Sequence, residues 1–208
     1  MRTLKLGFAL DGNSDYPVIP VLCRRLIQEH FPEIPQEDIS ELRPRKTGHG
    51  FVRELPVFAR QLQNRGVDII VAIVDTDNTL INERRRLLRE AQEKCRVQQI
   101  PACIADGLAV RAMETWLLAD ETALFAVFDG DRPLEALPAP ENDPAPKDTL
   151  NRLVRILTDG EEVTFVSFAR ELAEAVQLRV LQNRCPHCDE FATNILNCVR
   201  EWQRFAPQ

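Results

Sequence analysis

The chain has 208 residues, of which 44% are hydrophobic and 28% are charged, and its formal net charge is -6. This length and composition fit one soluble globular domain with a sizeable core. The acidic balance argues against a protein that coats nucleic acid, but an enzyme with a local basic groove remains compatible with it. The apolar runs are far shorter than the roughly 18–20 residues that cross a bilayer, and the first five residues do not resemble a secretory signal. We therefore expect a cytoplasmic protein without membrane contact.

The first predicted strand covers residues 3–10, a mostly apolar run. It ends at an acidic turn that contains Asp11 and Asp15. The spacing of the apolar residues that follow predicts a helix over residues 16–31. Residues 39–42 form a short, weaker strand candidate. The first strand thus leads directly into carboxylates.

The most basic short stretch of the chain follows, at residues 43–50, and contains Arg43, Arg45 and Lys46 together with two glycines. Arginine, lysine and flexible backbone amides are suited to holding a phosphate group. The alternative is an exposed, positively charged connection, and the sequence leaves both open. An amphipathic helix is predicted next, over residues 51–64.

Residues 67–79 read V-D-I-I-V-A-I-V-D-T-D-N-T. The apolar run within them predicts a strand over residues 68–74 that is buried on both faces. Asp75 and Asp77 follow, and they point the same way if the extended geometry persists. Two adjacent anions repel each other unless a cation lies between them. The alternative is a solvated turn in which Asn78 or Thr79 caps the next helix.

A densely charged helix is predicted over residues 80–96, and its run Arg84-Arg85-Arg86 is typical of a solvated helix face. Residues 100–106 predict a fourth strand that closes on an acidic residue. A buried helix is then predicted over residues 108–120, with Glu114 in its middle. A buried carboxylate needs a partner, which is either Arg111 one turn earlier or a functional site.

The C-terminal part is predicted to begin with a loop or lid over residues 128–146, which are rich in Pro, Gly and Asp. Helices are expected over residues 147–158, 161–176 and 189–205. We expect a single domain with its core in residues 1–127 and a helical extension over residues 147–208. The predicted fold class is α/β, with a mostly parallel sheet flanked by helices.

Six cysteines are present, without a dense framework. Cys23 and Cys103 lie in apolar surroundings and are expected to be small buried residues. Cys185 and Cys188 form a C-x-x-C, which is typical of half a zinc site or a redox pair. Even with His187 and Cys198 the spacing fits no zinc template, so we interpret the pair as incidental, at a helix start.

Two segments and the order of elements resemble the Toprim (topoisomerase–primase) domain. Asp11-Gly12 stands where family members carry Glu-Gly, and Asp75-Thr76-Asp77 matches the family's Asp-x-Asp. The chain is also similar to small stand-alone Toprim-like proteins akin to the overcoming-lysogenization-defect (OLD) nucleases. That likeness rests on A-V-R-A-M-E-T-W-L-L-A-D at 109–120, on Pro144-Ala-Pro-Lys147 and on the helical tail.

The resemblance implies a nuclease that cleaves phosphodiester bonds in nucleic acid, in phage defence or DNA repair, with an ATPase partner encoded nearby. Oxygen-only ligands favour Mg²⁺ or Mn²⁺. Asp11, Asp75 and Asp77 would hold one ion, and Asp15 or Glu114 would serve a second ion or orient water. Arg43, Arg45 and Lys46 would hold the phosphate backbone.

The chain departs from the family pattern at two places. Asp11 is one methylene shorter than the usual Glu, and the lysine expected near residues 164–168 is missing. The alternative to an enzyme is therefore a non-catalytic, Toprim-shaped subunit that docks to an ATPase. A third possibility is a nuclease that stays silent until its ATPase partner is present.

Overall fold

The computed structural model of the chain describes residues 2–42, 46–77, 79–128, 139–161 and 163–205. Within these residues four parallel strands form one sheet: β1 (Leu4–Leu10), β2 (Gln36–Leu42), β3 (Ile69–Asp75) and β4 (Cys103–Ala109). Their order in the sheet is β2-β1-β3-β4. The predicted α/β class with a parallel sheet flanked by helices is confirmed.

Strand β3 is the most buried strand, since all seven of its residues are shielded from solvent. Its side chains alternate between two hydrophobic clusters. Ile69, Val71 and Ile73 belong to one cluster, and Ile70 and Val74 belong to the other. The strand is therefore apolar throughout because both of its faces are covered, as its sequence predicts.

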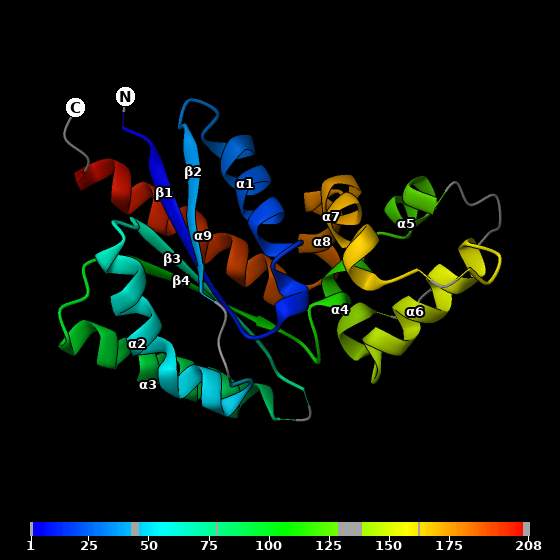
Figure 1. Ribbon diagram of the computed structural model, residues 1–208, viewed down its shortest axis with the longest axis horizontal. Coiled ribbons are helices and arrows are strands. Elements are labelled where there is room, and N and C mark those ends of the chain that lie inside the picture. Colours follow the sequence, from blue (N-terminus) through cyan, green and yellow to red (C-terminus); the bar gives the residue numbers. More distant parts are fainter. Residues whose placement is uncertain (1, 43–45, 78, 129–138, 162, 206–208) are drawn as a thin grey trace.

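Two layers of helices cover the sheet (Figure 1). Helices α2 (His49–Asn64) and α3 (Ile81–Val97) lie on one face, where they share a cluster with Ile70 and Val74. Helices α1 (Ile19–His30) and α9 (Pro186–Phe205) lie on the other face, and α9 packs directly on β4. The C-terminal helix is thus part of the main core.

A group of shorter helices lies beyond the carboxyl ends of the strands, on the right of Figure 1. It comprises α4 (Glu114–Leu117), α5 (Glu121–Phe128), α6 (Pro146–Leu157), α7 (Phe165–Ala175) and α8 (Leu178–Arg184), with the 3-10 turns η1 (Asn13–Asp15) and η2 (Pro140–Asn142). The Trp116 ring in α4 stacks on the Phe191 ring in α9, with ring centroids 5.6 Å apart. This contact joins the group of shorter helices to the layer formed by α1 and α9.

The prediction of a helix over residues 108–120 is wrong. Strand β4 runs on to Ala109, and the helix α4 comprises only Glu114–Leu117. An apolar run does not by itself distinguish a buried strand from a buried helix, so the boundary between them was misplaced. Asp106 accordingly lies within the strand, where its carbonyl and carboxylate accept hydrogen bonds from Asn194 in α9.

The interpretation of Arg84-Arg85-Arg86 as a solvated face is wrong for Arg84, whose side chain is only 2% exposed. Arg85 forms an ion pair with Glu190 in α9, at 2.6 Å. Arg86 is exposed and pairs with Glu90 on its own helix. Arg84 points inward because it lies on the buried face with Leu88 and Ala91, one and two turns further along α3.

The cysteines also differ from expectation. Cys103 is not a small buried thiol, because it forms a disulfide with Cys198. Cys185 and Cys188 are buried around the start of α9, and burial raises the pKa of both thiols, that of Cys185 to about 12. The prediction that this pair holds no structural zinc stays a prediction. Among the described helices, none is long and apolar enough to cross a membrane.

Candidate active site

Asp75 is the last residue of β3 and lies at the carboxyl edge of the sheet. Its carboxylate is largely buried. Oδ2 lies 3.8 Å from the Nζ atom of Lys147, at the start of α6. Oδ1 has no hydrogen-bond donor in the described part of the chain. A buried carboxylate oxygen without a donor is costly, so this atom calls for a ligand.

Asp11 follows β1, the parallel neighbour of β3, and therefore reaches the same edge of the sheet. Its backbone N–H donates to the Ile73 carbonyl at 3.0 Å. Its Oδ1 accepts a hydrogen bond from the backbone N–H of Gly48 at 2.7 Å. Gly48 has φ 57°, in the region that favours glycine, and an added Cβ would lie 3.3 Å from the Arg84 guanidinium. The backbone just before α2 thus holds the Asp11 carboxylate, and Arg84 lies close to the same backbone.

Asp15 lies in η1, and its side chain turns back over Gly12. Oδ2 accepts from the Gly12 N–H at 3.0 Å, and Oδ1 accepts from the Ser14 hydroxyl at 3.2 Å. Only 1% of the residue is exposed. The acidic turn after β1 therefore places its second carboxylate inside the protein, beside the first.

Glu114 is the first residue of α4 and is buried as predicted. Its Oε2 has no hydrogen-bond donor among the described residues. Arg111 precedes the helix, at φ 65°, and its guanidinium donates to the Asp77 carbonyl at 3.4 Å. The i,i+3 helical pair considered for Arg111 and Glu114 is therefore not formed, because there is no helical turn between them.

The four buried carboxyl groups act on one another electrostatically. Burial is the main cause that raises the pKa of Asp75 to about 9, and the negative charge of Asp15 raises it further. The positive charge of Lys147 acts in the opposite direction but is too weak to cancel them. Burial and the charge of Glu114 raise the pKa of Asp15 to about 7. Burial also raises the pKa of Asp11 and of Glu114. Without added positive charge, the cluster therefore holds protons at neutral pH.

Lys147 supplies positive charge to this cluster. Glu114 and Asp75, followed by Asp77 and Asp15, raise its pKa in spite of burial, so it stays an ammonium. Lys147 was not among the predicted site residues. Its only sequence signal is its place in the Pro144–Lys147 segment.

Asp77 lies at the rim of the cluster and its side chain is 56% exposed. Strand β3 ends at Asp75, and Asp77 has φ 49°, so the extended geometry does not persist to it. Its Oδ2 lies 3.9 Å from Arg84 Nη2, and its charge raises the pKa of Asp11. Asp75 and Asp77 thus occupy different surroundings, one buried and one at the surface.

Thr76, between these aspartates, joins the loops that follow β3 and β4. Its backbone N–H donates to the Ala109 carbonyl at 2.9 Å, and its hydroxyl accepts from the Arg111 N–H at 2.7 Å. The Asp77 N–H donates to the Arg111 carbonyl at 3.0 Å. Thr79 does not cap α3, since its hydroxyl accepts from Arg84 and the N-cap is Leu80. Asn78 lies outside the described residues.

A pocket of about 300 Å³ opens beside the cluster. Its walls come from the loops after β3 and β4 and from the start of α6: Asp77, Arg111, Ala112, Pro144, Ala145, Pro146, Lys147 and Asp148. Its lining includes two cationic side chains, Arg111 and Lys147, and two carboxylates, Asp77 and Asp148. These charges balance, so an anionic group in the pocket would have Arg111 and Lys147 as its favourable contacts.

The predicted phosphate-binding stretch is only partly described. Arg43 and Arg45 lie outside the described residues. Lys46 is exposed, and its Nζ pairs with Glu54 Oε1 at 2.6 Å.

The donor set suits a hard divalent cation, because it consists of carboxylate oxygens and two of them are buried without a donor. The described residues contain no ready-made cage of three or more Asp, Glu, His or Cys ligands. Asp11, Asp15, Asp75 and Glu114 are the residues that would hold the ion, with Asp77 at the rim.

A model of the family described as "Domain of unknown function (DUF4276)" matches residues 12–196, which is most of the chain. No significant match to a curated protein or to a solved structure was found.

Proposed function

We propose a function for this chain, which belongs to the DUF4276 family of unknown function: Mg²⁺- or Mn²⁺-dependent cleavage of phosphodiester bonds in nucleic acid. The observation that carries the proposal is the pair of buried oxygens without donors, Asp75 Oδ1 and Glu114 Oε2. They belong to a cluster of carboxyl groups that raise one another's pKa. The likeness to Toprim domains rests on Asp11-Gly12 and Asp75-Thr76-Asp77, and the likeness to OLD nucleases rests on residues 109–120, on Pro144–Lys147 and on the helical tail. Both support the same function.

The roles of the residues follow from their surroundings. Asp11, Asp15, Asp75 and Glu114 would hold the cation, and burial keeps water from competing with them. A bound Mg²⁺ or Mn²⁺ supplies charge stabilisation at a phosphate oxygen and lowers the pKa of a water molecule. Lys147 and Arg111 bind the anionic backbone in the pocket, and Lys147 offsets charge that develops on the phosphate.

The test is a cleavage assay with the purified chain, on supercoiled plasmid and on single-stranded DNA and RNA, with Mg²⁺ or Mn²⁺. We expect nicking with the metal, none with EDTA, and loss of nicking in Asp75→Asn. Isothermal titration calorimetry with Mn²⁺ shows whether that variant also loses metal binding. A chain that neither binds Mn²⁺ nor cleaves any of the three substrates contradicts the proposal.

The second candidate function is a non-catalytic subunit of an ATPase, and Asp11 in place of the family's Glu favours it. Under this reading the chain binds the metal weakly or not at all and stays inactive after addition of the ATPase encoded nearby. A nuclease that is silent on its own gains activity on that addition. We propose a cytoplasmic location for either function.

A further inference from the structure

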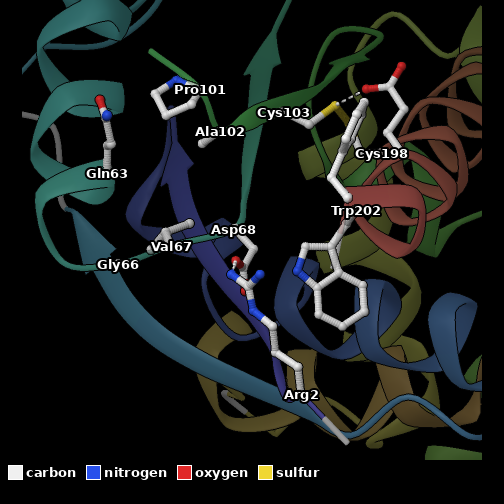
Figure 2. Close-up of a pocket in the computed structure, with 12 residues that line it drawn as sticks. Arg2, Gln63, Gly66, Val67, Asp68, Pro101, Ala102, Cys103, Cys198 and Trp202 are labelled. Atoms are coloured by element: carbon white, nitrogen blue, oxygen red, sulfur yellow. Dashed lines mark hydrogen bonds and ion pairs between the residues drawn. A yellow bond between two sulfur atoms is a disulfide. The ribbon is translucent and has the colours of Figure 1, made fainter. Parts of the chain in front are cut away.

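A second, larger pocket of about 520 Å³ lies at the amino end of the sheet, opposite the carboxylate cluster. Its walls come from Arg2 before β1, from Val67 and Asp68 before β3, from the start of β4 and from the end of α9 (Figure 2). The Arg2 guanidinium pairs with Asp68 and lies 5.7 Å from the centroid of the Trp202 ring. The site proposed above does not use this pocket.

The disulfide between Cys103 and Cys198 forms part of its wall, as Figure 2 shows. It joins the first residue of β4 to the second half of α9, 95 residues away in sequence. The two bonded cysteines differ in burial, because Cys103 is partly exposed and Cys198 is 4% exposed. The four other cysteines are free and buried. Cys103 is thus the most exposed cysteine residue in the described part of the chain.

We propose that this pocket is a thiol–disulfide exchange site, at which a low-molecular-weight thiol reduces the Cys103–Cys198 bond. The volume suits a small peptide thiol, and the lining includes the Arg2–Asp68 ion pair and Glu201, which provide charged contacts for its carboxylate and ammonium groups. Reducible disulfides in cytosolic proteins are usually catalytic or redox-sensing, so the inference agrees with the proposed location.

The exchange proceeds in two steps. A thiolate of the small thiol attacks Sγ of Cys103, the sulfur–sulfur bond breaks, and Cys198 leaves as a thiolate that takes up a proton. A second small thiolate attacks the outer sulfur of the mixed disulfide on Cys103, which releases the Cys103 thiol after proton uptake. Two small thiols are oxidised to one small disulfide, and the protein gains two thiols.

The first test counts thiols. In protein purified without reductant and then denatured, we expect four of the six cysteines to titrate as thiols. Native protein treated with excess reduced glutathione should then show six. Iodoacetamide added to this native, reduced protein should alkylate Cys103 at least tenfold faster than Cys198, as measured by peptide mass mapping.

The second test uses a matched pair of variants with oxidised glutathione as the probe. Cys198→Ser leaves Cys103 unpaired and should take up one glutathione, whereas Cys103→Ser leaves the buried Cys198 and should take up none. Cys95→Ser, in α3, is the control and should behave as the unmodified protein. If circular dichroism shows that either variant is unfolded, the proposal is tested by the relative alkylation rates of Cys103 and Cys198 in the unmodified protein. Six thiols without reductant, no reduction by glutathione, or equal labelling of Cys103 and Cys198 would each overturn the proposal.

Discussion

The Nζ atom of Lys147 lies 3.8 Å from Oδ2 of Asp75, although one residue opens α6 and the other closes β3. The same ammonium acts on the pKa of Glu114 and of Asp75. Positive charge thus reaches the cluster from the first turn of α6, which follows Pro144 and Ala145 of the pocket wall. Under the proposed function, a substrate phosphate in the pocket would lie beside Lys147, which lines it.

Replacing Lys147 by Met should lower the rate of Mn²⁺-dependent nicking about 100-fold, because it removes a positive charge next to the phosphate. The free energy of unfolding should change by less than about 1 kcal/mol, because the Lys147 side chain is 53% exposed and solvent screens its ion pair with Asp75. The measurement is the nicking rate at saturating metal. Lys94→Met, on the exposed face of α3, is the control and should keep full activity.

Replacing Glu114 by Gln should keep or raise the melting temperature of the metal-free protein while abolishing nicking. The substitution removes an ionisable group that is costly to charge in its buried position, and Oε2 has no donor to lose. Glu171→Gln, at an exposed position of α7, is the control. A loss of about 3–5 kcal/mol with nicking unchanged would instead identify Glu114 as part of a buried ion pair.

The stability of the metal-free protein should fall as the pH rises from about 4 to 9. The folded pKa of Asp75, about 9, lies above its unfolded value of 3.8, so the folded state binds more protons throughout this range. Asp15, with a pKa of about 7, acts in the same direction up to that pH. The stabilisation that Asp75 contributes is complete below pH 3.8 and has been lost once the pH passes 9. In between, each group lowers the free energy of unfolding by up to about 1.4 kcal/mol per pH unit.

Urea unfolding at a series of pH values measures this dependence. Asp75→Asn should flatten the curve, because it removes the group with the highest folded pKa. Saturating Mg²⁺ should also flatten it, since a bound cation favours the ionised carboxylates. A metal-free protein whose stability rises between pH 5 and 8 would contradict the raised pKa values.

Replacing Gly48 by Ala should lower both stability and nicking. Alanine is strained at φ 57°, which costs about 1–3 kcal/mol, and its Cβ would also press on Arg84 and displace the N–H that binds Asp11. Gly160→Ala is the matched control, because it also has a positive φ but nothing lies within 4 Å of its added Cβ. Equal losses in the two variants would show that the contact between Gly48 and Arg84 has no effect of its own.

The sequence predicted β1 and β3 well because both are mostly apolar runs, most clearly β3. It indicated β2 only weakly, at residues 39–42, because that strand is mostly charged and polar. It also predicted that Asp11 and Asp75 lie at the carboxyl ends of two strands, and in a parallel sheet these ends lie at the same edge. It did not predict Lys147, because the approach of α6 to β3 depends on how the helices beyond the sheet pack together.

The other errors have separate causes. A run of three arginines is usually solvated, and only the packing of α3 against the sheet shows that Arg84 is turned inward. The pairing of Cys103 with Cys198 joins residues far apart in sequence, and spacing cannot reveal such a pair. The short α4 was missed because its apolar neighbours continue from a strand.

Thr76 has a consequence for how the site responds to a ligand. Its backbone N–H and its hydroxyl both form hydrogen bonds with the segment after β4, so they link the chain after Asp75 to the chain around Arg111. Arg111 lines the pocket, so a ligand bound there would contact a residue whose backbone is hydrogen-bonded to the segment between the two aspartates.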